Sequence, residues 1–116
     1  MNEKISDTLK DLGIPVSLLG YSYLRKAISM VIVAPAVINQ LTKTIYPVVA
    51  LEFNTTPSRV ERAIKHAIEV GCVRGSLSAY NSIFRSSFAS DKGKPTNGEF
   101  IATVADWLTI KYGGSL

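Results

Sequence analysis

Apolar residues recur every three or four positions along almost the whole chain, which is the spacing of amphipathic α-helices. The pattern predicts helices over residues 5–12, 22–33, 36–45, 47–53, 57–72, 78–84 and 97–112. Pro35 and Pro47 separate consecutive helices, because proline ends a helix or opens its first turn. No run alternates between apolar and polar residues as a half-buried strand would. We therefore expect a compact all-α fold.

Residues 86–98 form the one long break in this pattern. The break holds serines, Lys-Gly-Lys-Pro at 92–95 and Asn-Gly at 97–98, which are typical of loops. Thr96 and Glu99 have the spacing of a capping box, which places the start of the last helix at this point. A chain of 116 residues has the size of one domain, so we expect residues 1–116 to form a single domain.

A polar turn at residues 54–56 separates two of the predicted helices. Asn54 tolerates the left-handed backbone conformation of a sharp turn, and Thr56 can cap the helix that Pro57 begins. On a helical wheel the apolar residues of this helix form one stripe. The opposite arc carries Ser58, Arg59, Glu61, Arg62, Lys65, His66 and Glu69. A short helix, a sharp turn and a longer amphipathic helix over residues 47–73 are typical of a helix-turn-helix.

The polar arc contains the residue types that read base edges in the major groove of DNA. Arginine can bind guanine O6 and N7 with two hydrogen bonds, and a carboxylate can accept one from cytosine N4. Lysine and serine can contact phosphates. The same arc would also suit the solvated face of a helix in an ordinary bundle, with Glu61 paired to Lys65 one turn away. The pattern alone leaves both interpretations open.

Positive charge is concentrated around this helix. The chain has 13 Lys and Arg against 9 Asp and Glu, a net charge of +4. Residues 57–94 alone carry seven Lys and Arg against three Asp and Glu. A localised basic segment is expected in a protein that binds a polyanion, although a solvated basic face has the same composition.

Residues for catalysis or metal binding are scarce. One histidine, His66, and one cysteine, Cys72, cannot supply a disulfide framework or a multi-cysteine zinc site. We therefore expect no enzyme activity, no catalytic residue, no metal and no cofactor. The longest apolar run, residues 27–38, is too short to span a bilayer. The N-terminus has no apolar signal core, so we expect no membrane contact and a cytoplasmic location.

Five side chains outside the polar arc carry their own expectations. Cys72 lies at the margin of the apolar stripe and should be partly buried. Phe100 and Trp107 lie two turns apart in the last helix and should pack in the core, with a dimer face as the other interpretation. Lys92 and Lys94 fit solvated charges and phosphate contacts equally well.

The run Phe-Asn-Thr-Thr-Pro-Ser-Arg-Val-Glu-Arg-Ala-Ile-Lys-His-Ala-Ile-Glu-Val at residues 53–70 is far more specific than a helical pattern. Gly-Ile-Pro at 13–15, Lys-Pro-Thr-Asn at 94–97 and Glu-Phe-Ile-Ala at 99–102 accompany it. Together these runs resemble the C-terminal effector domain of the response regulator that initiates sporulation in Firmicutes. The resemblance covers nearly the whole chain, in order and without large gaps.

The resemblance implies a six-helix domain that binds a TGTCGAA-type box in double-stranded DNA, with the helix over residues 57–72 in the major groove. It also implies a homodimer or tandem copies on the DNA, and a contact between residues 76–90 and a sigma subunit of RNA polymerase. The implied base contacts are Arg59, Glu61 and Arg62. The implied phosphate contacts are Ser58, Lys65 and His66.

Three departures limit this resemblance. The family's phosphoacceptor aspartate belongs to a receiver domain, which has no counterpart in residues 1–116. Residues 71–75 lack the family's usual tryptophan. Residues 76–90 match poorly, and Arg85 stands where the family has a typical glycine.

The alternative function is an adaptor on the same scaffold. Such a protein would bind a sigma subunit or another protein partner, and its DNA reading would be lost. The presence of Arg59, Glu61 and Arg62 argues against this alternative, because an adaptor has no need of that trio.

Overall fold

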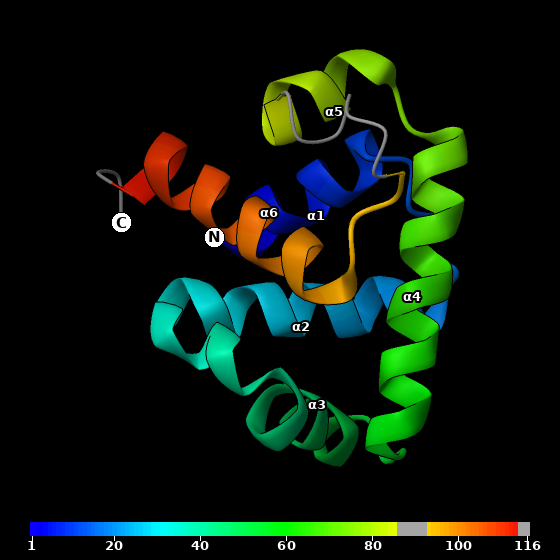
Figure 1. Cartoon of the computed structure of the whole chain (residues 1–116), viewed down its shortest axis with the longest axis vertical. Coiled ribbons are helices and arrows are strands. Elements are labelled where there is room, and N and C mark those ends of the chain that lie inside the picture. The colour runs from blue at the N-terminus through cyan, green and yellow to red at the C-terminus, as the bar shows by residue number, and fades with distance from the viewer. Residues whose placement is uncertain (86–92, 114–116) are drawn as a thin grey trace.

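The structure is a computed structural model that describes residues 1–85 and 93–113, and within these ranges it contains helices and no strands (Figure 1). The α-helices are α1 (Asn2–Asp11), α2 (Leu19–Val33), α3 (Tyr46–Glu52), α4 (Pro57–Arg74), α5 (Leu77–Phe84) and α6 (Asn97–Tyr112). A 3-10 helix, η1 (Pro35–Gln40), and a π-helical turn, η2 (Leu41–Ile45), connect α2 to α3. The predicted all-α, six-helix class is confirmed.

The helices enclose a core centred on α2. Figure 1 shows α2 lying across the molecule below α6, while α4 runs along one edge with α3 at one end and α5 near the other. Leu9, Leu24, Ile64 and Phe100, from α1, α2, α4 and α6, are fully buried. The recognition-type helix α4 is therefore held along one side by the core and leaves its other side to solvent.

Helices α2 and α4 cross closely in this core. A Cβ atom added to Gly20 of α2 would lie 2.3 Å from the Ala63 carbonyl oxygen and 2.6 Å from the Ala67 Cβ atom. The crossing therefore leaves no room for a side chain at residue 20, and glycine alone lets the two helices approach this closely. The crossing fixes the depth at which α4 sits on the domain.

The segment over residues 36–45 differs from its prediction. Its apolar spacing predicts an α-helix, whereas the structure has η1 followed by η2. Pro47 lacks the N–H that would bond to the carbonyl of residue 43, and its ring would clash with that carbonyl. The wider π turn avoids this conflict, since the Tyr46 N–H bonds to the Leu41 carbonyl five residues back.

Other boundaries shift by a few residues. Helix α2 begins at Leu19, three residues before its predicted start. The last helix begins at Asn97, as predicted, so Asn97 and Gly98, which the loop-forming pattern also covers, form the first turn of α6. The rest of the predicted loop from 86 to 92 lies outside the described residues, as does Lys92.

The last helix begins at the predicted capping box. The Thr96 hydroxyl oxygen accepts a hydrogen bond from the Glu99 N–H at 3.1 Å, and the Glu99 carboxylate accepts one from the Thr96 N–H at 2.9 Å. Phe100 is buried in the core as predicted. Trp107 is only partly buried at the core edge, where the Lys111 ammonium lies 4.6 Å from its ring centroid. The dimer-face interpretation of Trp107 stays a prediction.

Cys72 is partly buried, as predicted. Burial raises the pKa of its thiol, which therefore stays protonated at neutral pH. The neighbouring Tyr80 hydroxyl donates to the Leu12 carbonyl at 2.8 Å and ties α5 to the end of α1. Cys72 and Tyr80 therefore have a structural role, in packing α4 and α5 against the end of α1.

Arg85 has φ 54° and ψ −138°, a backbone conformation that only glycine adopts without strain. We expect Arg85→Gly to raise the free energy of unfolding by about 1 kcal/mol, because glycine removes the strain. Chemical denaturation followed by circular dichroism measures this change. Arg85→Ala is the control, since it removes the same side chain and keeps the strain; an equal gain from both variants would contradict the prediction.

Candidate nucleic-acid interface

The turn between α3 and α4 has the geometry of a helix-turn-helix. Asn54 adopts the predicted left-handed conformation, with φ 54°. The Thr55 N–H bonds back to the Ala50 carbonyl at 2.9 Å, which closes the turn. The Thr56 hydroxyl oxygen accepts from the Arg59 N–H at 3.3 Å, and Pro57 is the first residue of α4. Capping and turn together start α4 at a sharp angle to α3.

Small and branched apolar residues hold the two helices together. Val49 and Ala50 of α3 are buried. So are Val60 and Ile64, which belong to the apolar stripe of α4. Phe53, at the end of α3, is 36% exposed, and its ring lies edge-on to Tyr23 of α2 with the centroids 5.2 Å apart. The apolar side of the motif is thus used for packing, and the polar side is left to solvent.

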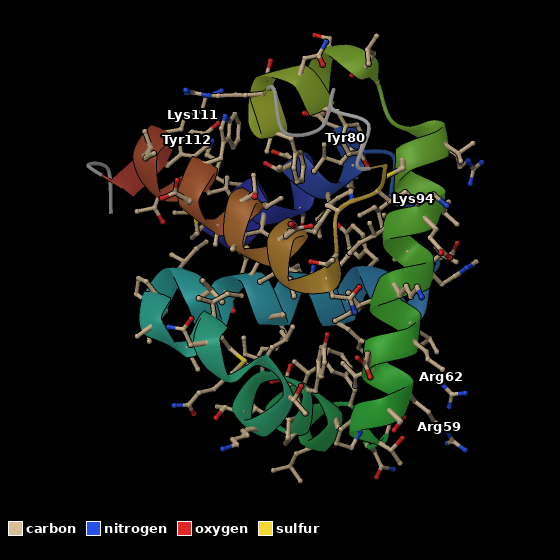
Figure 2. All side chains as sticks on the ribbon, in the orientation of Figure 1. Arg59, Arg62, Tyr80, Lys94, Lys111 and Tyr112 are labelled. Atoms are coloured by element: carbon tan, nitrogen blue, oxygen red, sulfur yellow. The ribbon has the colours of Figure 1, made fainter. Side chains whose placement is uncertain are left out.

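The structure brings all six predicted contact residues to one exposed surface. They are Ser58, Arg59, Glu61, Arg62, Lys65 and His66. At about 1.5 Å per residue this set extends about 12 Å along the helix axis. The major groove of B-DNA is wide enough to admit an α-helix with its side chains. Figure 2 shows Arg59 and Arg62 projecting away from the molecule at the α3 end of α4.

The charged side chains of this surface are available for a ligand. Glu61 and Lys65 form no ion pair, which contradicts the interpretation of Glu61 as a partner of Lys65. Among the described residues, the ion pair formed is between Lys26 and Glu52, with 3.2 Å between its nitrogen and oxygen atoms. Two arginines, a lysine and a carboxylate therefore face solvent from adjacent turns of one helix.

No pattern in the sequence predicts the cleft beside α4. A cleft of about 690 Å³ separates α4 from the segment that leads into α6, and Lys65, Lys94 and Asn97 line it. Lys94 is exposed beside α4 (Figure 2), and its role as a phosphate contact stays a prediction. Asn97 lies in the first turn of α6, where the capping box predicts it, but no signal in the sequence indicates its contacts with other helices.

The Asn97 amide contacts both helices of the motif. Its Nδ2 atom donates to the Tyr46 hydroxyl oxygen of α3 and to the main-chain carbonyl of Glu61 in α4, each at 3.0 Å. Burial raises the pKa of Tyr46, against a smaller lowering effect of the Asn97 hydrogen bond. Tyr46 therefore remains a neutral hydroxyl that can accept this bond.

Two other kinds of site find no support among the described residues. No group of three His, Cys, Asp or Glu side chains there is placed to hold a metal ion. No helix in the same part of the chain has the length and apolarity to cross a membrane.

An all-α fold in which a capped, amphipathic second helix presents arginine, glutamate and lysine to solvent defines the class of helix-turn-helix DNA-binding domains. Residues 5–108 match the family model described as the C terminal of the sporulation initiation factor Spo0A. The chain belongs to this family, and the resemblance found in its sequence is confirmed. The family consists of response regulator effector domains that bind DNA and regulate transcription. It is not a family of enzymes.

Proposed function

We propose that this domain is a sequence-specific reader of double-stranded DNA that regulates transcription in the cytoplasm, with α4 in the major groove. One observation carries the proposal. Arg59, Glu61 and Arg62 lie exposed on the first two turns of a helix whose opposite side is buried. Residue types of this kind recognise base edges, and their exposure leaves them available for a duplex.

The trio suits a TGTCGAA-type box. The guanidinium groups of Arg59 and Arg62 can each bind guanine O6 and N7, and the carboxylate of Glu61 can accept a hydrogen bond from cytosine N4. The box contains guanines and a cytosine that supply these partners. Base contacts of this geometry discriminate between sequences, whereas contacts to phosphates do not.

Ser58, Lys65 and His66 complete the proposed interface as phosphate contacts. All three are exposed and flank the reading trio along α4. A hydroxyl, an ammonium and an imidazole N–H can each donate to a phosphate oxygen. Such contacts set the position of α4 on the duplex and make binding depend on salt.

A salt titration tests the proposal. Binding to a TGTCGAA-type duplex is compared with binding to a scrambled duplex of equal length. We expect a difference in binding free energy of about 4 kcal/mol or more at physiological salt. Equal affinities for the two duplexes would reject sequence-specific reading.

We also propose two protein contacts. One is with a second copy of the domain bound to a tandem box, and the other is with a sigma subunit of RNA polymerase. The proposed sigma contact is residues 76–90, of which the structure describes residues 76–85. Leu77, the first residue of α5, is 69% exposed. Val73, at the end of α4, is 80% exposed. These apolar side chains favour the adaptor as the second candidate function. A domain that bound a sigma subunit but showed no preference between duplexes would be such an adaptor.

Lys65→Ala is expected to weaken binding to specific and scrambled duplexes by similar factors. Loss of one phosphate contact should lower the slope of log affinity against log salt by about one. Fluorescence anisotropy titrations at several salt concentrations measure this slope. Lys10→Ala is the control, because Lys10 is an exposed lysine on α1; an unchanged slope for the Lys65 variant would remove Lys65 from the interface.

A further inference from the structure

One side chain at the N-terminus of α6 forms hydrogen bonds with both helices of the helix-turn-helix. Asn97 is 51 residues from Tyr46 and 36 residues from Glu61 along the sequence. Its amide nevertheless donates to atoms of both, one in α3 and one in α4, each at 3.0 Å. An amide nitrogen carries two N–H groups, so both bonds can form together and bridge the two helices.

The bridge ends on the main chain of a proposed base-reading residue. A carbonyl oxygen has two lone pairs, so the Glu61 carbonyl can accept from Asn97 in addition to its helical hydrogen bond. The Glu61 peptide group lies between Arg59 and Arg62 in the sequence. A restraint at this point acts directly on the part of α4 that carries all three reading side chains.

The other end of the bridge is fixed as well. The capping box of Thr96 and Glu99 sets the first turn of α6, which contains Asn97. Tyr46 is 3% exposed, so its hydroxyl is held by the core beneath it. The amide therefore connects a fixed helix end and a buried ring to the exposed half of α4.

We propose that Asn97 is a positioning residue for DNA reading, which fixes the orientation of the N-terminal half of α4 relative to α3. This inference rests on the proposed function. Bidentate base contacts tolerate displacements of only about 0.5 Å, whereas a phosphate contact by a long side chain tolerates more. Loss of the bridge should thus lower affinity for the specific box and leave non-specific binding nearly unchanged.

The test compares Asn97→Ala and Tyr46→Phe with the unaltered domain, on TGTCGAA-type and scrambled duplexes. We expect Asn97→Ala to reduce affinity for the specific box about fivefold, the effect of one net hydrogen bond, with less than about a twofold change on the scrambled duplex. Tyr46→Phe removes one of the two bonds and should show a smaller loss of the same kind. The double variant should bind no more weakly than Asn97→Ala alone, because both changes act on one bridge.

A control separates positioning from general stability. Thr8→Ala removes a side-chain hydrogen bond of 2.8 Å to the Lys4 carbonyl on α1, away from α3 and α4. It should lower the melting temperature and, well below that temperature, leave both affinities unchanged. The amide NMR signals of α3 and the first half of α4 should shift in Asn97→Ala and stay in place in Thr8→Ala.

Each outcome decides between the claims. An unaltered domain without preference for the box would reject the proposed function, and the role of Asn97 with it. A clear preference that survives Asn97→Ala, or a loss of equal size on both duplexes, would overturn the positioning role alone. A loss of preference in Thr8→Ala would also overturn it, because general destabilisation would then explain the effect.

Discussion

Arg62→Ala is expected to weaken binding to a TGTCGAA-type duplex by about 1–3 kcal/mol, which is roughly a tenfold to hundredfold loss of affinity. Arg62 is exposed on the second turn of α4 and projects away from the domain (Figure 2). Alanine removes both donors of a bidentate contact with guanine. We therefore expect the preference for one base pair of the box to relax, which binding to a set of single-base variants measures.

Arg74→Ala is the matched control for this prediction. Arg74 is an exposed arginine in the last turn of the same helix, about 18 Å along the axis from Arg62. It loses the same charge and the same side chain at a point away from the proposed reading surface. Losses of equal size on specific and scrambled duplexes for Arg62→Ala would contradict a base contact and leave Arg62 as a phosphate contact.

Gly20→Ala is expected to lower the free energy of unfolding by about 3 kcal/mol or more, at the upper end for an overpacked core. The added Cβ atom would lie 2.3 Å from the Ala63 carbonyl oxygen, which belongs to the α4 backbone and cannot move alone. Either α4 shifts outward or the crossing with α2 opens. Urea denaturation measures the loss, and the DNA titration should show a reduced preference for the box because α4 carries the reading residues.

Gly98→Ala is the matched control, and we expect it to raise the free energy of unfolding where Gly20→Ala lowers it. A Cβ atom at Gly98 would lie 3.5 Å from Leu41 Cδ2, an ordinary contact distance. Since Gly98 lies in the first turn of α6, alanine should stabilise the domain by up to about 1 kcal/mol. A loss as small as a few tenths of a kcal/mol for Gly20→Ala would show that the α2–α4 crossing adapts, and would contradict the prediction.

The sequence predicted the elements whose signals are local. The apolar stripe placed α4 over residues 57–72, against Pro57–Arg74 in the structure, and the Thr96 capping box located the start of α6. Asn54 was predicted as a left-handed turn residue and is one. The α-helix predicted over residues 36–45 was wrong, because over pieces of five and six residues the apolar spacing does not distinguish an α-helix from 3-10 and π turns.

The candidate site divides in the same way. Exposure of Arg59, Glu61 and Arg62 on one surface followed from the helical wheel, since side chains on one arc of an amphipathic helix share a face. The Asn97 bridge did not follow, because the capping box and the loop-forming dipeptide predict only local structure and carry no information about a partner in α3 or α4. Its contacts depend on how α6 packs.

By itself the sequence determined the all-α class, the helix-turn-helix, the family and the side of α4 that faces solvent, because each depends on interactions within a few residues or on a specific run of them. The tertiary structure decided how α4 is held, through the close approach at Gly20 and the amide bridge from Asn97, and it also set the strained backbone at Arg85 after α5. These features join segments that lie far apart in the chain or fix a backbone angle. Their geometry is set by the packing of whole helices, which no pattern of neighbouring residues specifies.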